Sequence, residues 1–230
     1  DMLLVGDSLG QVVYGLDSTI PVSLDMMIAH GAAVVRGSYH SVVIVDMPFG
    51  SYEQSPEHAI ASATRVMKET GAAAIKMEGG EAMAETVAFL TQRGIPVMGH
   101  VGLTPQALNV LGGHKVQGRD EATAAKVLAD AKAIDEAGAF SLVIEGVIEP
   151  LAIEATRAVS CPTIGIGASA QCDGQVLVAE DMLGLFERVP RFVRKFGDMA
   201  GDIEKAVAEY AEGVRNRTFP ADEQTYQPKS

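Results

Sequence analysis

The sequence has no tryptophan, only two cysteines and no apolar run long enough to span a membrane. Cys161 and Cys172 have neither the spacing of a metal-binding motif nor the density of a disulfide-bonded secreted domain. We therefore expect reduced thiols in a cytoplasmic protein. A chain that lacks an apolar run of about 20 residues is not predicted to cross a bilayer.

Positive charge is also scarce, because 18 Lys and Arg stand against 30 Asp and Glu, a formal net charge of −12. A nucleic acid or an anionic membrane needs clustered basic residues, so neither is an expected partner. With 230 residues, 47% of them hydrophobic, the chain can bury one large core. We predict a single domain over residues 1–230, with residues 221–230 as a flexible polar tail.

Short apolar segments alternate with helical patterns along the chain. One helix start is indicated by Ser55, Pro56 and Glu57, and its end by Gly71, because these residue types favour those positions. A terminal amphipathic helix is predicted over residues 200–215. Strands are predicted at residues 2–5, 42–45, 73–77, 96–98, 142–144, 163–166 and, more weakly, 176–178.

This alternation is typical of βαβ units and a parallel sheet. Seven strands, the first beginning at residue 2, predict an α/β fold of the (β/α)8 TIM barrel type whose first strand and helix are missing from the N-terminus. The alternative is an open, doubly wound sheet. The barrel is preferred because polar residues end many strands, and no Gly-x-Gly-x-x-Gly motif follows the first one.

Charged residues end the first three predicted strands. Lys76 and Glu78 share one face of the third strand, since strand side chains alternate; they could form a structural ion pair. Asp7, Asp46 and Glu78 would converge at the carboxyl ends and repel each other unless a cation lay between them. Ligands that offer only oxygen favour Mg²⁺. Asp7 or Asp46 could each instead be a turn or cap residue.

Four further residues are candidates for substrate chemistry. Lys76 would present a cation to an anionic substrate, and the Ser8 hydroxyl would donate to its carboxylate. Glu145 ends the fifth strand and could shuttle a proton, or could be an acid favoured by the dipole of the next helix. His100 could bind substrate, or could be a satisfied core histidine.

The connection over residues 102–119 is longer than a usual βα loop and follows a strand on the catalytic face of a barrel. Glycines at both ends favour a lid or a substrate wall over an ordinary insertion.

Seven motifs, in this order and spacing, resemble the ketopantoate hydroxymethyltransferase family over nearly the whole chain. They are Val5-Gly6-Asp7-Ser8-Leu9-Gly10, Asp17-Ser18-Thr19-Ile20-Pro21-Val22, Val45-Asp46-Met47-Pro48-Phe49, Lys76-Met77-Glu78-Gly79-Gly80, Gly99-His100-Val101-Gly102-Leu103-Thr104-Pro105-Gln106, Lys115-Val116-Gln117-Gly118 and Ile164-Gly165-Ile166-Gly167-Ala168. One departure is Ser169, where the family usually has glycine.

The resemblance implies a (β/α)8 barrel, a homo-oligomer that is typically a decamer, and a Mg²⁺-dependent enzyme of pantothenate biosynthesis. Its substrates would be 3-methyl-2-oxobutanoate, which reacts through a Mg²⁺-stabilised enolate, and 5,10-methylenetetrahydrofolate, which donates the hydroxymethyl group. The alternative is a Mg²⁺-dependent carbon–carbon lyase or mutase of the phosphoenolpyruvate mutase and isocitrate lyase group. The resemblance also implies roles for residues at the matching positions. The metal would lie among Asp7, Asp46 and Glu78, and the keto acid would bind at Asp7, Ser8, Asp46 and Lys76. Glu145 would be the catalytic proton acceptor.

Overall fold

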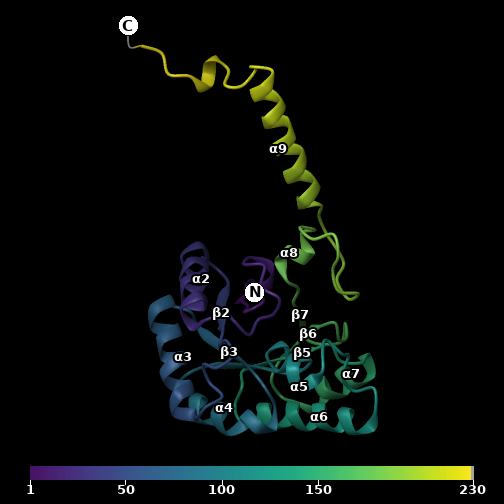
Figure 1. Ribbon diagram of the computed structural model, residues 1–230. Coiled ribbons are helices and arrows are strands. Elements are labelled where there is room, and N and C mark those ends of the chain that lie inside the picture. The colour runs from purple at the N-terminus through teal and green to yellow at the C-terminus, as the bar shows by residue number, and fades with distance from the viewer. Residues whose placement is uncertain (229–230) are drawn as a thin grey trace. The chain divides into compact units, whose positions relative to one another are not determined.

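Seven parallel strands form one curled sheet in which each strand pairs with the next along the chain (Figure 1). The structure is a computed structural model and describes residues 1–228. The strands are β1 (Met2–Val5), β2 (Val42–Asp46), β3 (Ala74–Glu78), β4 (Val97–Gly102), β5 (Ser141–Glu145), β6 (Thr163–Ile166) and β7 (Gly174–Gln175). Sequential parallel pairing with alternating helices is the (β/α)8 type of arrangement that the sequence predicts. Within residues 1–228, β1 and β7 are the two edges of the sheet.

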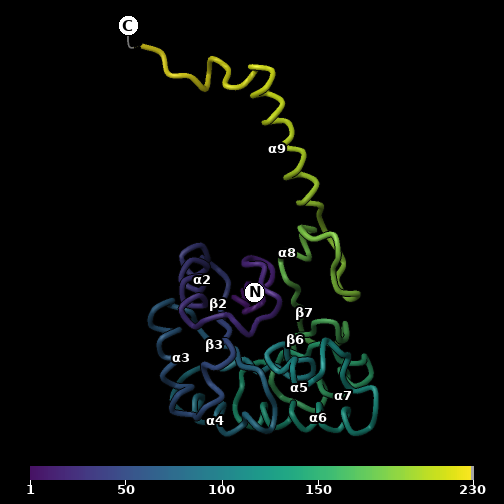
Figure 2. The backbone as a smooth tube through the Cα atoms, viewed as in Figure 1, coloured from purple at the N-terminus to yellow at the C-terminus, as the bar shows by residue number. Residues whose placement is uncertain are grey.

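Helices cover the outer side of the curled sheet, as the backbone trace also shows (Figure 2). Helix α2 packs on β1 and β2, and α6 packs on β4 and β5. The α-helices of this part are α1 (Leu9–Val12), α2 (Leu24–Gly37), α3 (Pro56–Thr70), α4 (Ala84–Thr91), α5 (Leu108–Leu111), α6 (Glu121–Glu136) and α7 (Glu149–Ala158), and the 3-10 helices are η1 (Glu81–Met83) and η2 (Pro105–Ala107).

Helix α3 begins and ends where the sequence predicts. The Ser55 hydroxyl accepts a hydrogen bond from the His58 amide at 3.2 Å, which satisfies a free amide of the first turn. Gly71 closes the helix with φ of 78°, a left-handed conformation that glycine adopts without steric cost.

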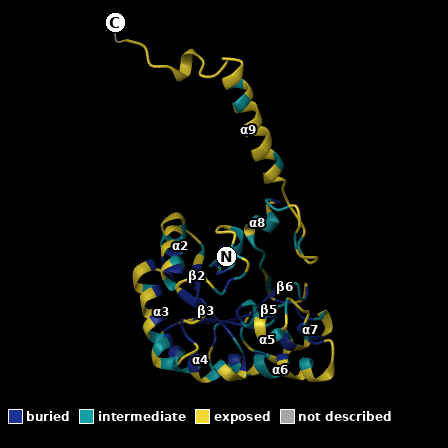
Figure 3. Ribbon diagram, in the orientation of Figure 1, coloured by how far each residue is buried: buried dark blue, intermediate teal, exposed yellow. Residues whose placement is uncertain are grey.

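The sheet separates two apolar layers, and buried residues concentrate on both sides of it (Figure 3). The larger layer lies between the strands and the helices and includes Val45, Ile75 and Leu142. The smaller layer lies on the concave side, where Ile44, Met98 and Val143 pack together. Because neighbouring strand residues point to opposite faces, Ile44 and Val45 belong to different layers.

Two strands differ clearly from the sequence prediction. The last strand is Gly174–Gln175 rather than residues 176–178, because pairing with β6 sets its position; only the Val176 amide continues the ladder, donating to the Gly165 carbonyl. Strand β4 continues to Gly102 instead of ending at residue 98. The long connection over residues 102–119 contains η2 and α5, and its role as a lid or substrate wall stays a prediction.

The chain divides into two compact units, Asp1–Val176 and Leu177–Ser230, and the second is described by itself. It contains α8 (Ala179–Met182), α9 (Met199–Arg215) and the 3-10 helix η3 (Asp222–Gln224). Helix α9 confirms the predicted terminal helix, and its apolar stripe, which includes Ile203 and Val207, is exposed.

The prediction of one domain over residues 1–230 stays a prediction. Part of the predicted tail, residues 229–230, lies outside the described residues. Among residues 1–228, no helix is both long and apolar enough to cross a bilayer.

Candidate active site

The strand register explains which predicted site residues meet. Asp46 on β2 lies opposite Lys76 on β3, and Glu78 on β3 lies opposite His100 on β4. All four side chains belong to the concave face, because they continue the alternation that begins with the buried Ile44, Ala74 and Met98. The carboxyl ends of three neighbouring strands therefore bring two acids, a lysine and a histidine together.

Lys76 pairs with Asp46 rather than with Glu78, which corrects the ion pair considered from the sequence. The Lys76 Nζ to Asp46 Oδ1 distance is 2.5 Å, and both side chains are buried. The other Asp46 oxygen accepts the Asp7 amide at 3.0 Å, which ties the end of β1 to the pair. Burial alone would lower the pKa of Lys76, but the surrounding carboxylates, Asp46 first, raise it above its ordinary value, so the ammonium stays charged.

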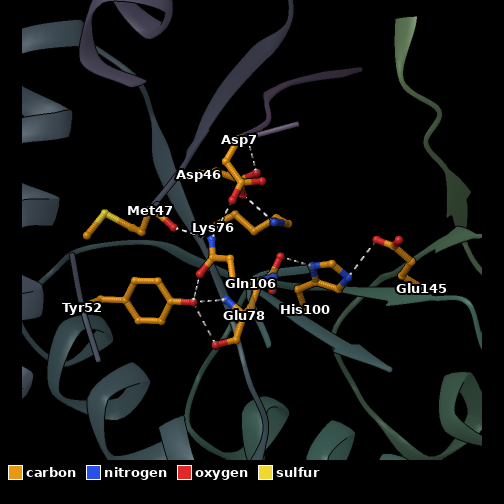
Figure 4. A network of polar contacts seen from close by, with 9 residues as sticks. All are labelled: Asp7, Asp46, Met47, Tyr52, Lys76, Glu78, His100, Gln106 and Glu145. Atoms are coloured by element: carbon orange, nitrogen blue, oxygen red, sulfur yellow. Dashed lines mark hydrogen bonds and ion pairs between the residues drawn. The ribbon is translucent and has the colours of Figure 1, made fainter. Parts of the chain in front are cut away.

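His100 lies between two carboxylates (Figure 4). Its Nδ1 is 3.4 Å from Glu78 Oε1 and its Nε2 is 3.2 Å from Glu145 Oε2. Neither ring nitrogen has the geometry of a full hydrogen bond, so we describe both contacts as ion pairs. Burial and Lys76 lower the pKa of His100, but Glu145 and Glu78 outweigh them and raise it to about 9. Burial raises the pKa of Glu78, while His100 brings it below its usual value.

Glu145 is the most open carboxylate of this group. Its side chain is 16% exposed, whereas that of Glu78 is 4% exposed. Glu145 ends β5 and is oriented by the contact with His100. A small molecule at the strand ends would therefore reach Glu145 before it reached the other acids.

Gln106 and Tyr52 are central to the site, and neither was predicted as a site residue from the sequence. The Gln106 amide group donates from Nε2 to Asp7 Oδ2 and to the Met47 carbonyl, both at 2.9 Å. The backbone amide of Gln106 donates to Glu78 Oε2 at 2.9 Å. The Tyr52 hydroxyl donates to Oε1 of Gln106 at 2.5 Å. The only indication in the sequence was the place of Gln106 in one of the seven motifs.

Ser8 does not join this network. It occupies the N-cap position of α1 with helical backbone angles and is half-buried. Within residues 1–228 its hydroxyl makes no hydrogen bond, either to the helix or elsewhere. Its predicted role toward a substrate carboxylate stays a prediction.

A separate cavity of about 350 Å³ lies at the opposite end of the concave face. It is lined by Met2, Leu4, Ile44, Met98 and Val143, among others. The lining is mainly apolar, and its acidic side chains, Asp1 and Asp173, would repel an anionic substrate. The polar strand ends, and not this cavity, are therefore the candidate active site.

Comparison with known proteins decides the family. A family model described as ketopantoate hydroxymethyltransferase matches residues 1–222. This chain belongs to the ketopantoate hydroxymethyltransferase family. It is 73% identical, over 229 residues, to the 3-methyl-2-oxobutanoate hydroxymethyltransferases of Novosphingobium aromaticivorans and Erythrobacter litoralis, covering all of this chain and 79% of each relative. The prediction of the family from the seven motifs is confirmed.

A solved structure of phosphonopyruvate hydrolase superposes with a TM-score of 0.53, at 15% identity, over 97% of this chain and 78% of that one. At this identity the likeness concerns the fold alone. The superposition supports the predicted α/β barrel type of fold for this member of the ketopantoate hydroxymethyltransferase family.

The donor atoms at the strand ends fit a hard divalent cation in their chemistry. Burial first, and then the Asp46 carboxylate, raise the pKa of Asp7 to about 7, so negative charge here is poorly compensated. A divalent cation would reduce the electrostatic repulsion among the Asp7, Asp46 and Glu78 carboxylates. As the side chains lie, however, no three His, Cys, Asp or Glu residues among residues 1–228 surround one point as metal ligands. Ligation by Asp7, Asp46 and Glu78 therefore stays a prediction.

Proposed function

We propose that the protein transfers a hydroxymethyl group from 5,10-methylenetetrahydrofolate to 3-methyl-2-oxobutanoate, giving 2-dehydropantoate for pantothenate synthesis. The observation that carries the proposal is the 73% identity, across the whole chain, to relatives named as 3-methyl-2-oxobutanoate hydroxymethyltransferases. The folate donor is the finer part of the proposal and rests on the family resemblance. The buried charges at the strand ends support it, because they supply the groups that a 2-oxo acid and its deprotonation require.

Lys76 is the group that would attract the substrate carboxylate. Its ammonium is held in place by Asp46, and the pKa of Lys76 is raised, so the positive charge persists at neutral pH. When bound, Mg²⁺ would supply an electrophile that polarises the keto oxygen, and Asp7, Asp46 and Glu78 would hold the ion. His100 would orient Glu145, and its predicted contact with the substrate stays a prediction.

Glu145 would accept the proton from C3 of the keto acid. A general base must be reachable and held in a fixed direction, and Glu145 is the most open acid and faces His100 at 3.2 Å. The C3–H bond breaks, its electron pair moves into the enolate, and C3 then forms a bond to the one-carbon unit. The two C–N bonds between the one-carbon unit and folate break, and water supplies the hydroxyl oxygen. The proton from C3 and one proton from water end on the two folate nitrogens, so the keto acid, methylenetetrahydrofolate and water give 2-dehydropantoate and tetrahydrofolate.

The test is product formation by the purified protein. We expect 2-dehydropantoate only when 3-methyl-2-oxobutanoate, 5,10-methylenetetrahydrofolate and Mg²⁺ are all present, and no product after treatment with a chelator. Turnover of a 2-oxo acid without folate would instead favour a carbon–carbon lyase or mutase. Failure to form any product from the complete mixture would contradict the proposed function.

We extend the proposal to a cytoplasmic homo-oligomer, a decamer as the family resemblance implies. Light scattering on the purified protein would measure the assembly directly, and a monomer at micromolar concentration would contradict this part.

A further inference from the structure

Gln106 is a buried residue to which the proposed mechanism gives no role. It lies in η2, at the start of the long connection, and is 5% exposed. Its side chain reaches across the carboxyl ends of β1 and β2, and its backbone amide reaches the acid that ends β3 (Figure 4). One residue thus contacts the ends of three consecutive strands.

The orientation of this amide is fixed by its partners. Nε2 faces two oxygen acceptors, Asp7 Oδ2 and the Met47 carbonyl, whereas Oε1 faces the Tyr52 hydroxyl. A rotation that exchanged the amide oxygen and nitrogen would place an oxygen against a carboxylate and a carbonyl. Tyr52 is itself held, because its hydroxyl accepts the Glu78 amide at 3.2 Å. The side-chain amide of Gln106 therefore has one favoured orientation, with Nε2 toward Asp7 and the Met47 carbonyl.

The two N–H donors of Gln106 reduce the electrostatic repulsion between the carboxylates of Asp7 and Glu78. Asp7 and Glu78 are both buried, and the Glu78 carboxylate disfavours the charged form of Asp7. The two carboxylates would turn away from each other if nothing held them. The Gln106 backbone amide holds one oxygen of Glu78, and its side-chain amide holds one oxygen of Asp7. The second oxygen of Asp7 stays available, and the second oxygen of Glu78 faces His100 at 3.4 Å, so both side chains are held in fixed positions.

We propose that Gln106 is a positioning residue that holds Asp7 and Glu78 ready for a divalent cation and fastens the connection over residues 102–119 to them. This inference rests on the proposed function, since it concerns the metal that the function requires. Without Gln106, each cation that binds would have to organise the two carboxylates itself, and affinity would fall. Residues that orient metal ligands in this way typically change metal affinity by about 10–100-fold when they are removed.

The experiment measures Mg²⁺ binding by titration calorimetry on chelator-treated protein without substrates. Gln106→Met keeps the length of the side chain and the backbone donor to Glu78, but removes the donor to Asp7. We expect Mg²⁺ to bind this variant about 10–100-fold more weakly than it binds the wild type. Thermal unfolding of each variant is measured alongside.

Thr70→Val is the matched control for a lost buried hydrogen bond. Thr70 ends α3, and its hydroxyl donates to the Val66 carbonyl at 2.6 Å and accepts the Ala72 amide at 2.9 Å. This variant should lower the melting temperature while its Mg²⁺ affinity stays within about twofold of the wild type. Equal loss of Mg²⁺ affinity in Thr70→Val and Gln106→Met would show a general stability effect and overturn the inference.

Tyr52→Phe provides a second variant if Gln106→Met does not fold. It removes the donor to Gln106 Oε1 and leaves the contact with Asp7, so we expect a smaller, several-fold loss of Mg²⁺ affinity. Wild-type affinity in every folded variant of Gln106 and Tyr52 would overturn the inference while leaving the proposed function intact, provided that the wild type forms product. A wild type that neither binds Mg²⁺ nor forms product would overturn both.

Discussion

The concave face of the sheet has two ends that differ in chemistry although the same strands build them. At the amino end of the strands, Ile44, Met98 and Val143 are buried against each other. Two residues further along β2 and β4, the same face carries Asp46 and His100, which are equally buried. The strand period of two places both sets on one face, so the change from apolar to charged is a change of sequence and not of geometry.

The two ends contribute differently to stability. Burying an apolar side chain stabilises a fold by about 1.5–3 kcal/mol, whereas a buried charge costs several kcal/mol unless partners compensate for it. An apolar core could be extended to the carboxyl end at no such cost. The charges at the carboxyl end are thus explained by the proposed reaction rather than by folding stability. The apolar amino end of the same strands shows what the face looks like where no reaction is proposed.

The largest expected effect is on turnover. Glu145→Gln removes the proton acceptor while it keeps the size of the side chain, and we expect the turnover rate to fall by about 10²–10⁴-fold. Melting temperature should change little, because Glu145 is partly open to solvent. Glu149→Gln, an exposed acid at the start of α7, is the control and should keep full activity. Steady-state kinetics would check both, and equal activity of the two variants would exclude Glu145 as the base.

The next effect is on folding stability at the polar end. Lys76→Met leaves the Asp46 carboxylate buried without its cation, and the free energy of unfolding should fall by about 3–5 kcal/mol. Lys126→Met removes a partly exposed lysine that pairs with Asp130 and Glu81, and should cost less than about 1 kcal/mol. Denaturant unfolding measures both, and a loss at Lys76 no larger than at Lys126 would contradict the description of a buried, interdependent pair.

Met98→Ala probes the apolar end. It removes buried apolar atoms and should lower the free energy of unfolding by about 2–5 kcal/mol, near the lower limit because Met98 already lines a cavity. The Michaelis constants of the folded variant should stay within a few-fold of the wild type. A loss of Mg²⁺ dependence in this variant would mean that the two ends are not independent.

The smallest effect is a dependence of stability on pH that comes from His100. Its pKa is raised to about 9 in the folded protein, so the folded state holds a proton that the unfolded state loses above its ordinary value of 6.5. This stabilisation is complete below pH 6.5 and is lost as the pH rises through about 9. Metal-free wild type should lose about 1–3 kcal/mol across this interval. His100→Gln should show a flatter profile in denaturant unfolding, and an unchanged slope would contradict the assignment.

The sequence was sufficient to predict the fold and to point to charged residues that the structure brings together, while their catalytic and metal-binding roles stay predictions. Asp46, Lys76 and Glu145 could be found because each is a charge that interrupts or ends an apolar strand pattern, and such patterns survive in a single sequence. The order of the strands also followed from their alternation with helices, whose boundaries are marked by residues such as Ser55 and Gly71.

The partners of these residues could not be found in the same way. That Lys76 meets Asp46 depends on the register between β2 and β3, which the hydrogen bonds of the sheet decide and which no local pattern encodes. Gln106 and Tyr52 are neutral polar residues outside the strands, and nothing in their neighbourhood indicates that they are buried. Their importance arises only when distant segments meet, since Gln106 and Asp7 are 99 residues apart.

The central claim is that the polar end removes a proton from C3 of 3-methyl-2-oxobutanoate. Proton NMR in deuterium oxide, with Mg²⁺ and the keto acid but without folate, follows the loss of the C3 hydrogen signal. The wild type and Met98→Ala should exchange this hydrogen with solvent, and Glu145→Gln should exchange it at least about 100-fold more slowly. Equal exchange in wild type and Glu145→Gln, or no exchange in a wild type that forms product, would contradict the account.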